Sequence, residues 1–474
     1  MPELRPDLIV VMADDHATHA ISTYGSRIAT TPNIDRIAAE GMRFDGACCT
    51  NSLCAPSRAA ILTGTYNHVN GVTTLGAAID ARQPAFPALL RDAGYRTVLV
   101  GKWHLGHGGV SDPYGFDSWC VLPGQGDYRD PEMIDNGRTR RFPGYVTDVI
   151  TDLALAELRE RDRDPEHDRP LCLLVHHKAP HRPWEPDETH AKEDLRPVAV
   201  PDTYDDDYSF RAEAARRARM RVRRDLDRVD LKEDPPPGLT DEQHAHWAYQ
   251  RFITDYLRCV ASLDDNVGRL LDAIEESGRA RDTVVLYTSD QGFFLGDHGW
   301  FDKRFMYEES LRMPLLIRYP REVEAGSSTD ALVVNVDFAQ TLLDLAGVPA
   351  HPRMQGRSLR PLLRGARPAD WRRSVYYRYW EHLDHQHKVA AHYGVRTASH
   401  KLVCYYGSGL DQPGTSAETT PVEWELFDLE RDPAELRSVH DHPAYAGVRA
   451  ELTAELARLQ AEVGDEPYPL AVPR

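Results

Sequence analysis

Four short apolar runs mark the N-terminal two-thirds of the chain. They lie at residues 8–13, 97–100, 171–176 and 284–289. Because these runs are continuously apolar, they predict strands that are buried on both faces, as in a parallel sheet. Helical patterns separate them, at residues 32–40, 87–93 and about 242–276. The alternation predicts an α/β fold with a large, mostly parallel sheet sandwiched by helices.

The pattern changes after residue 370. Aromatic and polar residues alternate in VYYRYWEH and HYGVRTASHKLVCYY, which is typical of a small antiparallel sheet. A helical pattern follows at residues 445–463. We therefore predict a main domain over residues 1–370 and a C-terminal α+β subdomain over 371–474.

One charged segment, at about residues 204–238, interrupts the main domain. It is acidic, then arginine-rich, and it ends in three prolines. Such a segment could grip a polyanion, but its charges of both signs favour a solvated helix inserted between core elements.

Composition and charge exclude several classes of protein. The chain has 474 residues, a net charge of −18 and 41% hydrophobic residues. The acidic balance argues against a nucleic-acid partner, and no apolar run approaches the roughly 20 residues that span a bilayer. The N-terminal run lacks a signal cleavage site, so we expect a cytoplasmic protein. Seven cysteines without regular spacing do not predict a disulfide framework.

Polar, titratable side chains follow each of the four predicted strands. The carboxyl ends of parallel strands are where α/β proteins bind ligands, so we expect these side chains to form one site. In chain order they are Asp14 and Asp15, Lys102 and His104, His181, and Asp290 and Gln291.

Three carboxylates and an amide carbonyl favour a hard divalent cation, Ca²⁺ or Mg²⁺. A zinc site built from His16, Asp14 and Asp290 is the alternative. On its own, the Asp14–Asp15 pair would be interpreted as a helix cap or a turn.

Cys54 poses a separate question. Pro56 suits the first turn of a helix, which would place Cys54 just outside the helix N-terminus and near Arg58. That positive environment predicts a lowered thiol pKa, so a cysteine nucleophile is one interpretation. However, a thiolate is a poor ligand for a hard cation, and both would have to share this site.

The segment CAPSRAAILTG at residues 54–64 resembles the signature C-x-P-S-R-x-x-x-x-T-G of type I sulfatases, in the alkaline phosphatase superfamily. Further motifs of that family follow in order over nearly the full length. They include TPNIDR at 31–36, GKWHLG at 101–106, APHRP at 179–183 and SDQG at 289–292. The chain looks most like the carbohydrate-acting branch, such as N-acetylglucosamine-6-sulfatases and mucin-desulfating enzymes.

The resemblance implies a modified residue and a metal site. A formylglycine-generating enzyme would convert Cys54 to formylglycine (3-oxoalanine), whose hydrate offers oxygen in place of sulfur and removes the mismatch. Together with this oxygen, the implied metal ligands are Asp14, Asp15, Asp290 and Gln291. Ca²⁺ is expected, with Mg²⁺ as the alternative. Many relatives carry Asn or His where this chain has Gln291.

The resemblance also implies catalytic roles. Arg58 and Lys102 would hold the hydrated aldehyde, and His104 would take its proton. His181 and Lys303 would hold the sulfate and protonate the leaving alcohol. His298 and His392 are candidate substrate contacts, although His298 has a structural interpretation as well.

The implied reaction is hydrolysis of a sulfate monoester in two steps. An oxygen of the hydrated aldehyde attacks sulfur and displaces the alcohol, and the aldehyde then re-forms as sulfate leaves. The acidic chain favours a small or terminal sulfated sugar, or an aryl sulfate, over a long polyanion. A phosphonate monoester or phosphodiester hydrolase with the same site is the alternative. A non-catalytic sulfoglycan-binding protein would lack catalytic residues that are present here. The sequence also allows a homo-oligomer.

Overall fold

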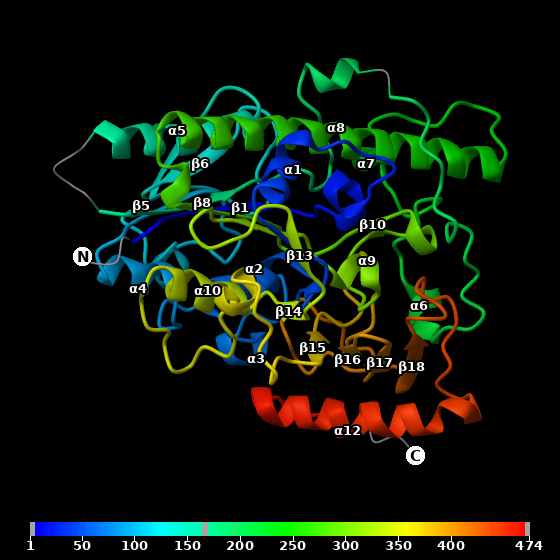
Figure 1. The fold of residues 1–474 in the computed structure, drawn as a ribbon. Coiled ribbons are helices and arrows are strands. Elements are labelled where there is room, and N and C mark those ends of the chain that lie inside the picture. The colour runs from blue at the N-terminus through cyan, green and yellow to red at the C-terminus, as the bar shows by residue number, and fades with distance from the viewer. Residues whose placement is uncertain (1–4, 164–168, 194, 470–474) are drawn as a thin grey trace.

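The computed structural model describes residues 5–163, 169–193 and 195–469 (Figure 1). A ten-stranded mixed sheet runs through its centre. Its strands, in spatial order, are β13 (Ser327–Thr329), β2 (Met42–Phe44), β12 (Leu315–Arg318), β9 (Thr283–Ser289), β1 (Asp7–Ala13), β8 (Leu171–His176), β4 (Arg96–Lys102), β5 (Ser118–Leu122), β6 (Glu132–Asp135) and β7 (Arg138–Arg141). From β9 to β5 the five central strands are parallel, which confirms the predicted α/β class.

Alternate side chains of β1 enter two separate cores, because successive residues of a strand face opposite sides of the sheet. Leu8 and Val10 belong to one core, and Ile9 and Val11 to the other. The core of Ile9 is covered by α1 (Pro32–Ala39), α5 (Val146–Arg163) and α8 (Asp241–Glu276). The core of Leu8 is covered by α2 (Cys54–Thr63), α4 (Phe86–Asp92) and α10 (Asp337–Leu345). Figure 1 shows these two helical layers above and below the sheet.

The C-terminal part forms the predicted antiparallel sheet and helix. Its elements are β15 (Ser374–Tyr379), β16 (His392–Thr397), β17 (His400–Tyr405), β18 (Glu423–Asp428) and α12 (Ala446–Val463). Leu452, Leu456 and Leu459 of α12 are buried in the same core as Leu402 of β17 and Leu8 of β1. The small sheet therefore continues the core beneath α2. The domain boundary at residue 370 stays a prediction.

Short elements complete the described chain. They are β3 (Ala47–Cys48), β10 (Phe294–Leu295), β11 (Phe301–Asp302), β14 (Val333–Val334), α3 (Asn67–Asn70), α6 (Glu213–Arg217), α7 (Arg228–Leu231), α9 (Glu308–Leu311) and α11 (Arg360–Leu363). Within the described residues, no helix combines the length and the apolar character that a bilayer crossing demands.

The prediction of a helix at residues 204–238 was wrong, although most arginines of the segment are exposed to solvent as expected. Apart from the single turns α6 and α7, the segment is irregular, and Ala215, Met220 and Val222 in it are buried. Val222 N donates to Gly299 O at 2.9 Å, so the segment packs on the turn between β10 and β11. Tertiary packing has overridden local helix propensity here.

Candidate active site

The carboxyl ends of β1 and β9 bring three aspartates together. Asp14 and Asp15 follow β1, and Asp290 follows β9. The backbone fixes the pairing, because Asp290 N donates to Ala13 O at 3.2 Å and Asp15 N donates to Asp290 Oδ1 at 3.2 Å. One oxygen from each aspartate lies within 4.8 Å of the other two, and all three residues are at most 1% exposed. This is the cluster that the strand ends predicted.

Each of these carboxylates has its own cationic partner. Lys102 Nζ contacts Asp14, and Arg58 Nε donates to Asp290 Oδ2 at 3.0 Å. Lys303 Nζ lies 2.5 and 2.7 Å from the two oxygens of Asp15. Three buried cations therefore balance three buried anions, as a water-excluded site requires.

The pKa values show that this balance is uneven. Burial raises the pKa of Asp15 to about 7 despite Lys303, with Asp14 and Asp290 adding repulsion. Burial and the charge of Asp14 raise the pKa of Asp290 to about 6. Burial acts on Asp14 too, but Lys102, His181 and Arg58 outweigh it and hold its pKa well below the usual range. The raised pKa values of Asp15 and Asp290 reflect burial and repulsion between neighbouring carboxylates, and a cation bound between them would relieve that repulsion.

Cys54 is the first residue of α2, with Leu53 at the N-cap and Pro56 in the first turn. Its Sγ, an Asp14 oxygen and a His181 ring nitrogen all lie within 4.8 Å of one another. The predicted lowering of the thiol pKa was wrong. Burial raises the pKa of Cys54, and the nearby Asp14 offsets the help from Lys303. The neutral thiol is therefore a weak nucleophile as it stands.

His104 and His181 follow β4 and β8. His104 adopts a left-handed backbone with φ 58°, and its buried Nδ1 has no hydrogen-bond partner among the described residues. Nδ1 of His181 lies 2.7 Å from Arg182 O, and Nε2 lies 3.7 Å from Asp15 Oδ2. Burial lowers the pKa of both imidazoles well below the usual value. Both rings are therefore neutral at neutral pH.

The donor atoms fit a hard divalent cation. Asp14 Oδ1 and Gln291 Oε1 are buried and lack hydrogen-bond partners in the described chain. An oxygen-rich cluster with unsatisfied oxygens matches the ligand preference of Ca²⁺ or Mg²⁺.

The zinc alternative was wrong, because in the described part of the chain His16 does not join the cluster of possible ligand atoms that holds Asp14 and Asp290. Its Nδ1 lies 2.6 Å from the Tyr287 hydroxyl and its Nε2 lies 3.3 Å from Ala20 O.

The two candidate substrate histidines are both fully buried. Nδ1 of His298 lies 3.0 Å from an Arg211 nitrogen and 3.2 Å from Asp206 Oδ2, so it joins the charged segment to the loop after β9. His392 stacks on Tyr377 with ring centroids 5.6 Å apart, and its Nδ1 lies 2.8 Å from Ala390 O. Neither ring is exposed to a ligand in this conformation, and a substrate role stays a prediction for both.

Two residues beside the site were missed from the sequence. Gln125 Oε1 accepts from Lys102 Nζ at 2.5 Å, and Arg304 donates to Glu381 Oε1 at 3.1 Å. Gln125 follows β5, whose run SWCVL was too short to stand out as a fifth parallel strand. Arg304 is adjacent to Lys303, and only the packing of the C-terminal sheet shows that it is buried.

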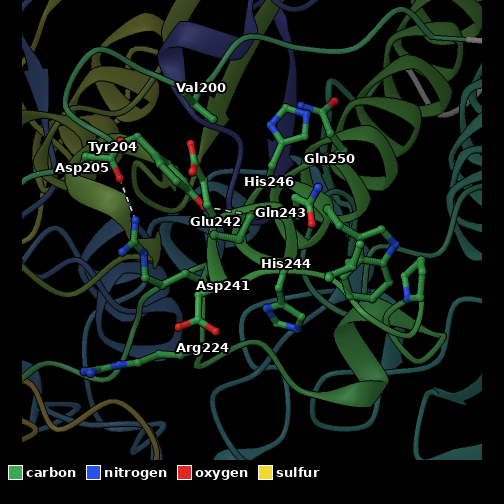
Figure 2. Close-up of a pocket in the computed structure, with 15 residues that line it drawn as sticks. Val200, Tyr204, Asp205, Arg224, Asp241, Glu242, Gln243, His244, His246 and Gln250 are labelled. Atoms are coloured by element: carbon green, nitrogen blue, oxygen red, sulfur yellow. Dashed lines mark hydrogen bonds and ion pairs between the residues drawn. The ribbon is translucent and has the colours of Figure 1, made fainter.

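A cavity of about 1260 Å³ lies elsewhere, at the N-terminal end of α8 (Figure 2). Tyr204, His244 and Trp247 line it, together with charged side chains. None of the predicted site residues is among the residues that line this cavity as described.

Two family models match the chain. The model described as "Sulfatase" covers residues 6–348, and the model described as "N-sulphoglucosamine sulphohydrolase, C-terminal" covers residues 296–462. The chain is 41% identical to an N-acetylglucosamine-6-O-sulfatase of Bacteroides thetaiotaomicron, over 97% of this chain and 87% of that protein. It is 28% identical to an N-acetylglucosamine-6-sulfatase of Homo sapiens, over 79% of this chain and 67% of that protein.

Solved structures agree with these matches. The structure of BT4656 in complex with its substrate D-glucosamine-2-N,6-O-disulfate superposes with a TM-score of 0.90 at 40% identity, over 97% of this chain and 98% of that one. The phosphonate monoester hydrolase SpPMH from Silicibacter pomeroyi superposes with a TM-score of 0.75 at 21% identity, over 98% and 96%. The second likeness is one of fold.

Proposed function

Because the chain belongs to the sulfatase family, we propose that it hydrolyses the sulfate ester of a sulfated carbohydrate, with a glucosamine 6-sulfate as the first candidate. One observation carries the proposal. Cys54 lies at the start of a buried helix, within 4.8 Å of an Asp14 oxygen and a His181 ring nitrogen. The family's modified residue would therefore stand beside both the metal ligands and a proton donor.

Two groups beyond the encoded side chains take part in the proposal. Formylglycine at position 54, once hydrated, supplies an oxygen nucleophile where the neutral thiol is a weak one. Asp14, Asp15, Asp290 and Gln291 would hold one divalent cation, Ca²⁺ first and Mg²⁺ second. The cation supplies Lewis-acid stabilisation of charge on the sulfate oxygens.

The chain's own side chains orient the ester and move its protons. Arg58, Lys102 and Lys303 are buried cations, so their charges act on the transferring group with little screening. Neutral His104, whose Nδ1 has no hydrogen-bond partner among the described residues, would accept a proton at residue 54. Neutral His181 has to gain a proton before it can protonate the leaving alcohol, and the negative charge of an entering sulfate ester favours that gain.

The test compares two esters on one preparation of enzyme. We expect kcat/KM for glucosamine 6-sulfate to exceed that for a phosphonate monoester. Mass spectrometry of the tryptic peptide 44–58 measures the fraction of Cys54 that is converted. The Cys54→Ala variant is the control and should be inactive. A higher kcat/KM for the phosphonate would favour the alternative hydrolase. Full activity with an unmodified thiol would refute the aldehyde mechanism.

A further inference from the structure

The loop that follows β5 leaves the sheet directly beside a catalytic candidate. Strands β4 and β5 are parallel, and Lys102, the last residue of β4, pairs with Leu122, the last residue of β5. The chain then turns through residues 123–127 and reaches Tyr128. A fifth strand end therefore opens onto the same edge of the sheet as the four that carry the site.

Gln125 in this loop contacts the ammonium group of Lys102. Oε1 of Gln125 lies 2.5 Å from Lys102 Nζ, and the lysine is fully buried. The only other hydrogen-bond acceptor for this ammonium group among the described residues is Asp14. An ammonium has three donors, and two acceptors from different elements fix the direction of the third. Because Gln125 is neutral, it orients Lys102 without cancelling its charge.

The same loop holds the backbone at His181. The Tyr128 hydroxyl donates to His181 O at 2.6 Å, and its ring is buried and stacked on Tyr145 with centroids 5.8 Å apart. The loop itself is closely fitted. Gly126 has φ 67°, and a Cβ there would meet a side-chain carbon of Leu122 at 2.8 Å. Because this turn is tightly packed and anchored, it can hold the Gln125–Lys102 contact and the Tyr128–His181 contact in a fixed position relative to each other.

We propose that Gln125 and Tyr128 are positioning residues that set Lys102 and His181 relative to each other. Gln125 acts on the Lys102 ammonium, and Tyr128 acts on the main chain of His181. This inference rests on the proposed function, since it assigns both targets to the reaction. It assigns a task to a loop in which the sequence predicted no site residue.

The experiment is a double-mutant cycle measured with glucosamine 6-sulfate, the first candidate substrate of the proposed function. Gln125→Met keeps the side-chain volume and removes the acceptor. We expect kcat to fall roughly 10- to 100-fold, with KM within about twofold, because misorientation costs rate more than binding. In the Lys102→Met background the same substitution should change kcat by less than about twofold, since its target is gone. Gln83→Met, which removes a side-chain contact to Val69 O, is the matched control and should stay within about twofold of wild type.

Tyr128→Phe tests the second contact. It keeps the ring and removes the hydroxyl, and we expect kcat to fall about three- to tenfold. Tyr145→Phe removes a comparable hydroxyl contact, to Glu185 O, and should leave kcat within about twofold of wild type.

Each variant is normalised to its fraction of converted Cys54, and its thermal midpoint is measured. Equal losses in both backgrounds, or a Gln125→Met rate within twofold of wild type, would overturn the positioning role. If the wild type cleaves only the phosphonate monoester, the cycle is run with that ester. The role of Gln125 is then tested independently of the sulfatase proposal, so failure of one is distinguishable from failure of the other.

Discussion

Arg58 and Asp290 form a buried ion pair, with Nε donating to Oδ2 at 3.0 Å. The pair joins helix α2 to the end of strand β9. Ser57, the preceding residue of the helix, also donates its hydroxyl to Asp290 O. The position of Cys54 against the aspartates therefore depends on contacts made one turn further along its own helix.

We expect Arg58→Met to lower the free energy of unfolding by about 3–5 kcal/mol, because it leaves a buried carboxylate without its cation. Urea denaturation measures the loss. Arg217→Met is the matched control, since Arg217 pairs with Glu418 at the surface, where both side chains are at least 40% exposed. It should cost less than about 1 kcal/mol. If both variants lost a similarly small free energy of unfolding, the buried pair would contribute no more to stability than the exposed pair.

Calcium should stabilise the protein more at about pH 7.5 than at about pH 5. Burial raises the pKa of Asp15 to about 7 and that of Asp290 to about 6. A carboxyl with a raised folded-state pKa contributes stability at low pH, and this contribution is lost as the pH rises from about 4, its ordinary pKa, to 6 or 7. A bound dication offsets that loss by neutralising the carboxylates. Thermal midpoints in chelator and in calcium measure the difference at each pH. If calcium raised the thermal midpoint equally at both pH values, the assignment of the aspartates as metal ligands would be contradicted.

Lys303→Met should cut turnover of a sulfate ester by roughly 100-fold or more, because it removes a charge from a water-excluded site. Steady-state kinetics on folded protein of equal Cys54 conversion measures the effect. Lys192→Met, at an exposed position, is the control and should leave turnover unchanged. Near-normal rates in Lys303→Met would remove this lysine from the catalytic set.

We expect the free energy of unfolding to fall between about pH 6.5 and 9, because His298 loses its proton over this range. Burial opposes its charge, but Asp206 and Glu309 outweigh both burial and Arg211 and raise its pKa to about 9. A raised histidine pKa gives stability that is complete below the unfolded value and lost as the pH passes the folded value. Urea denaturation across this range should show a decline of about 2–4 kcal/mol in the wild type. The His298→Asn variant should show a smaller decline, and an identical one would refute the assignment.

The sequence predicted the parts of this fold that local patterns encode. The strands at 8–13 and 284–289 are continuously apolar, and the polar residues that follow them, Asp14 and Asp290, were predicted as site residues for that reason. The irregular structure of the segment at 204–238 could not be predicted. Its residues favour a helix locally, but contacts with Gly299 and other positions distant in the sequence determine its conformation. The pKa of Cys54 was missed for a related reason. A helix start and an arginine are visible in a sequence, whereas complete burial beside Asp14 is not.

Burial of residue 54 also constrains how the protein matures. Only 1% of Cys54 is exposed, and its helix is enclosed by the main core. A modifying enzyme could not reach this thiol in the folded protein, because almost none of its surface is exposed. The conversion that we propose for Cys54 would therefore have to precede folding. Under the proposed mechanism, chains that fold with an unmodified thiol would stay inactive, however much modifying enzyme is supplied afterwards.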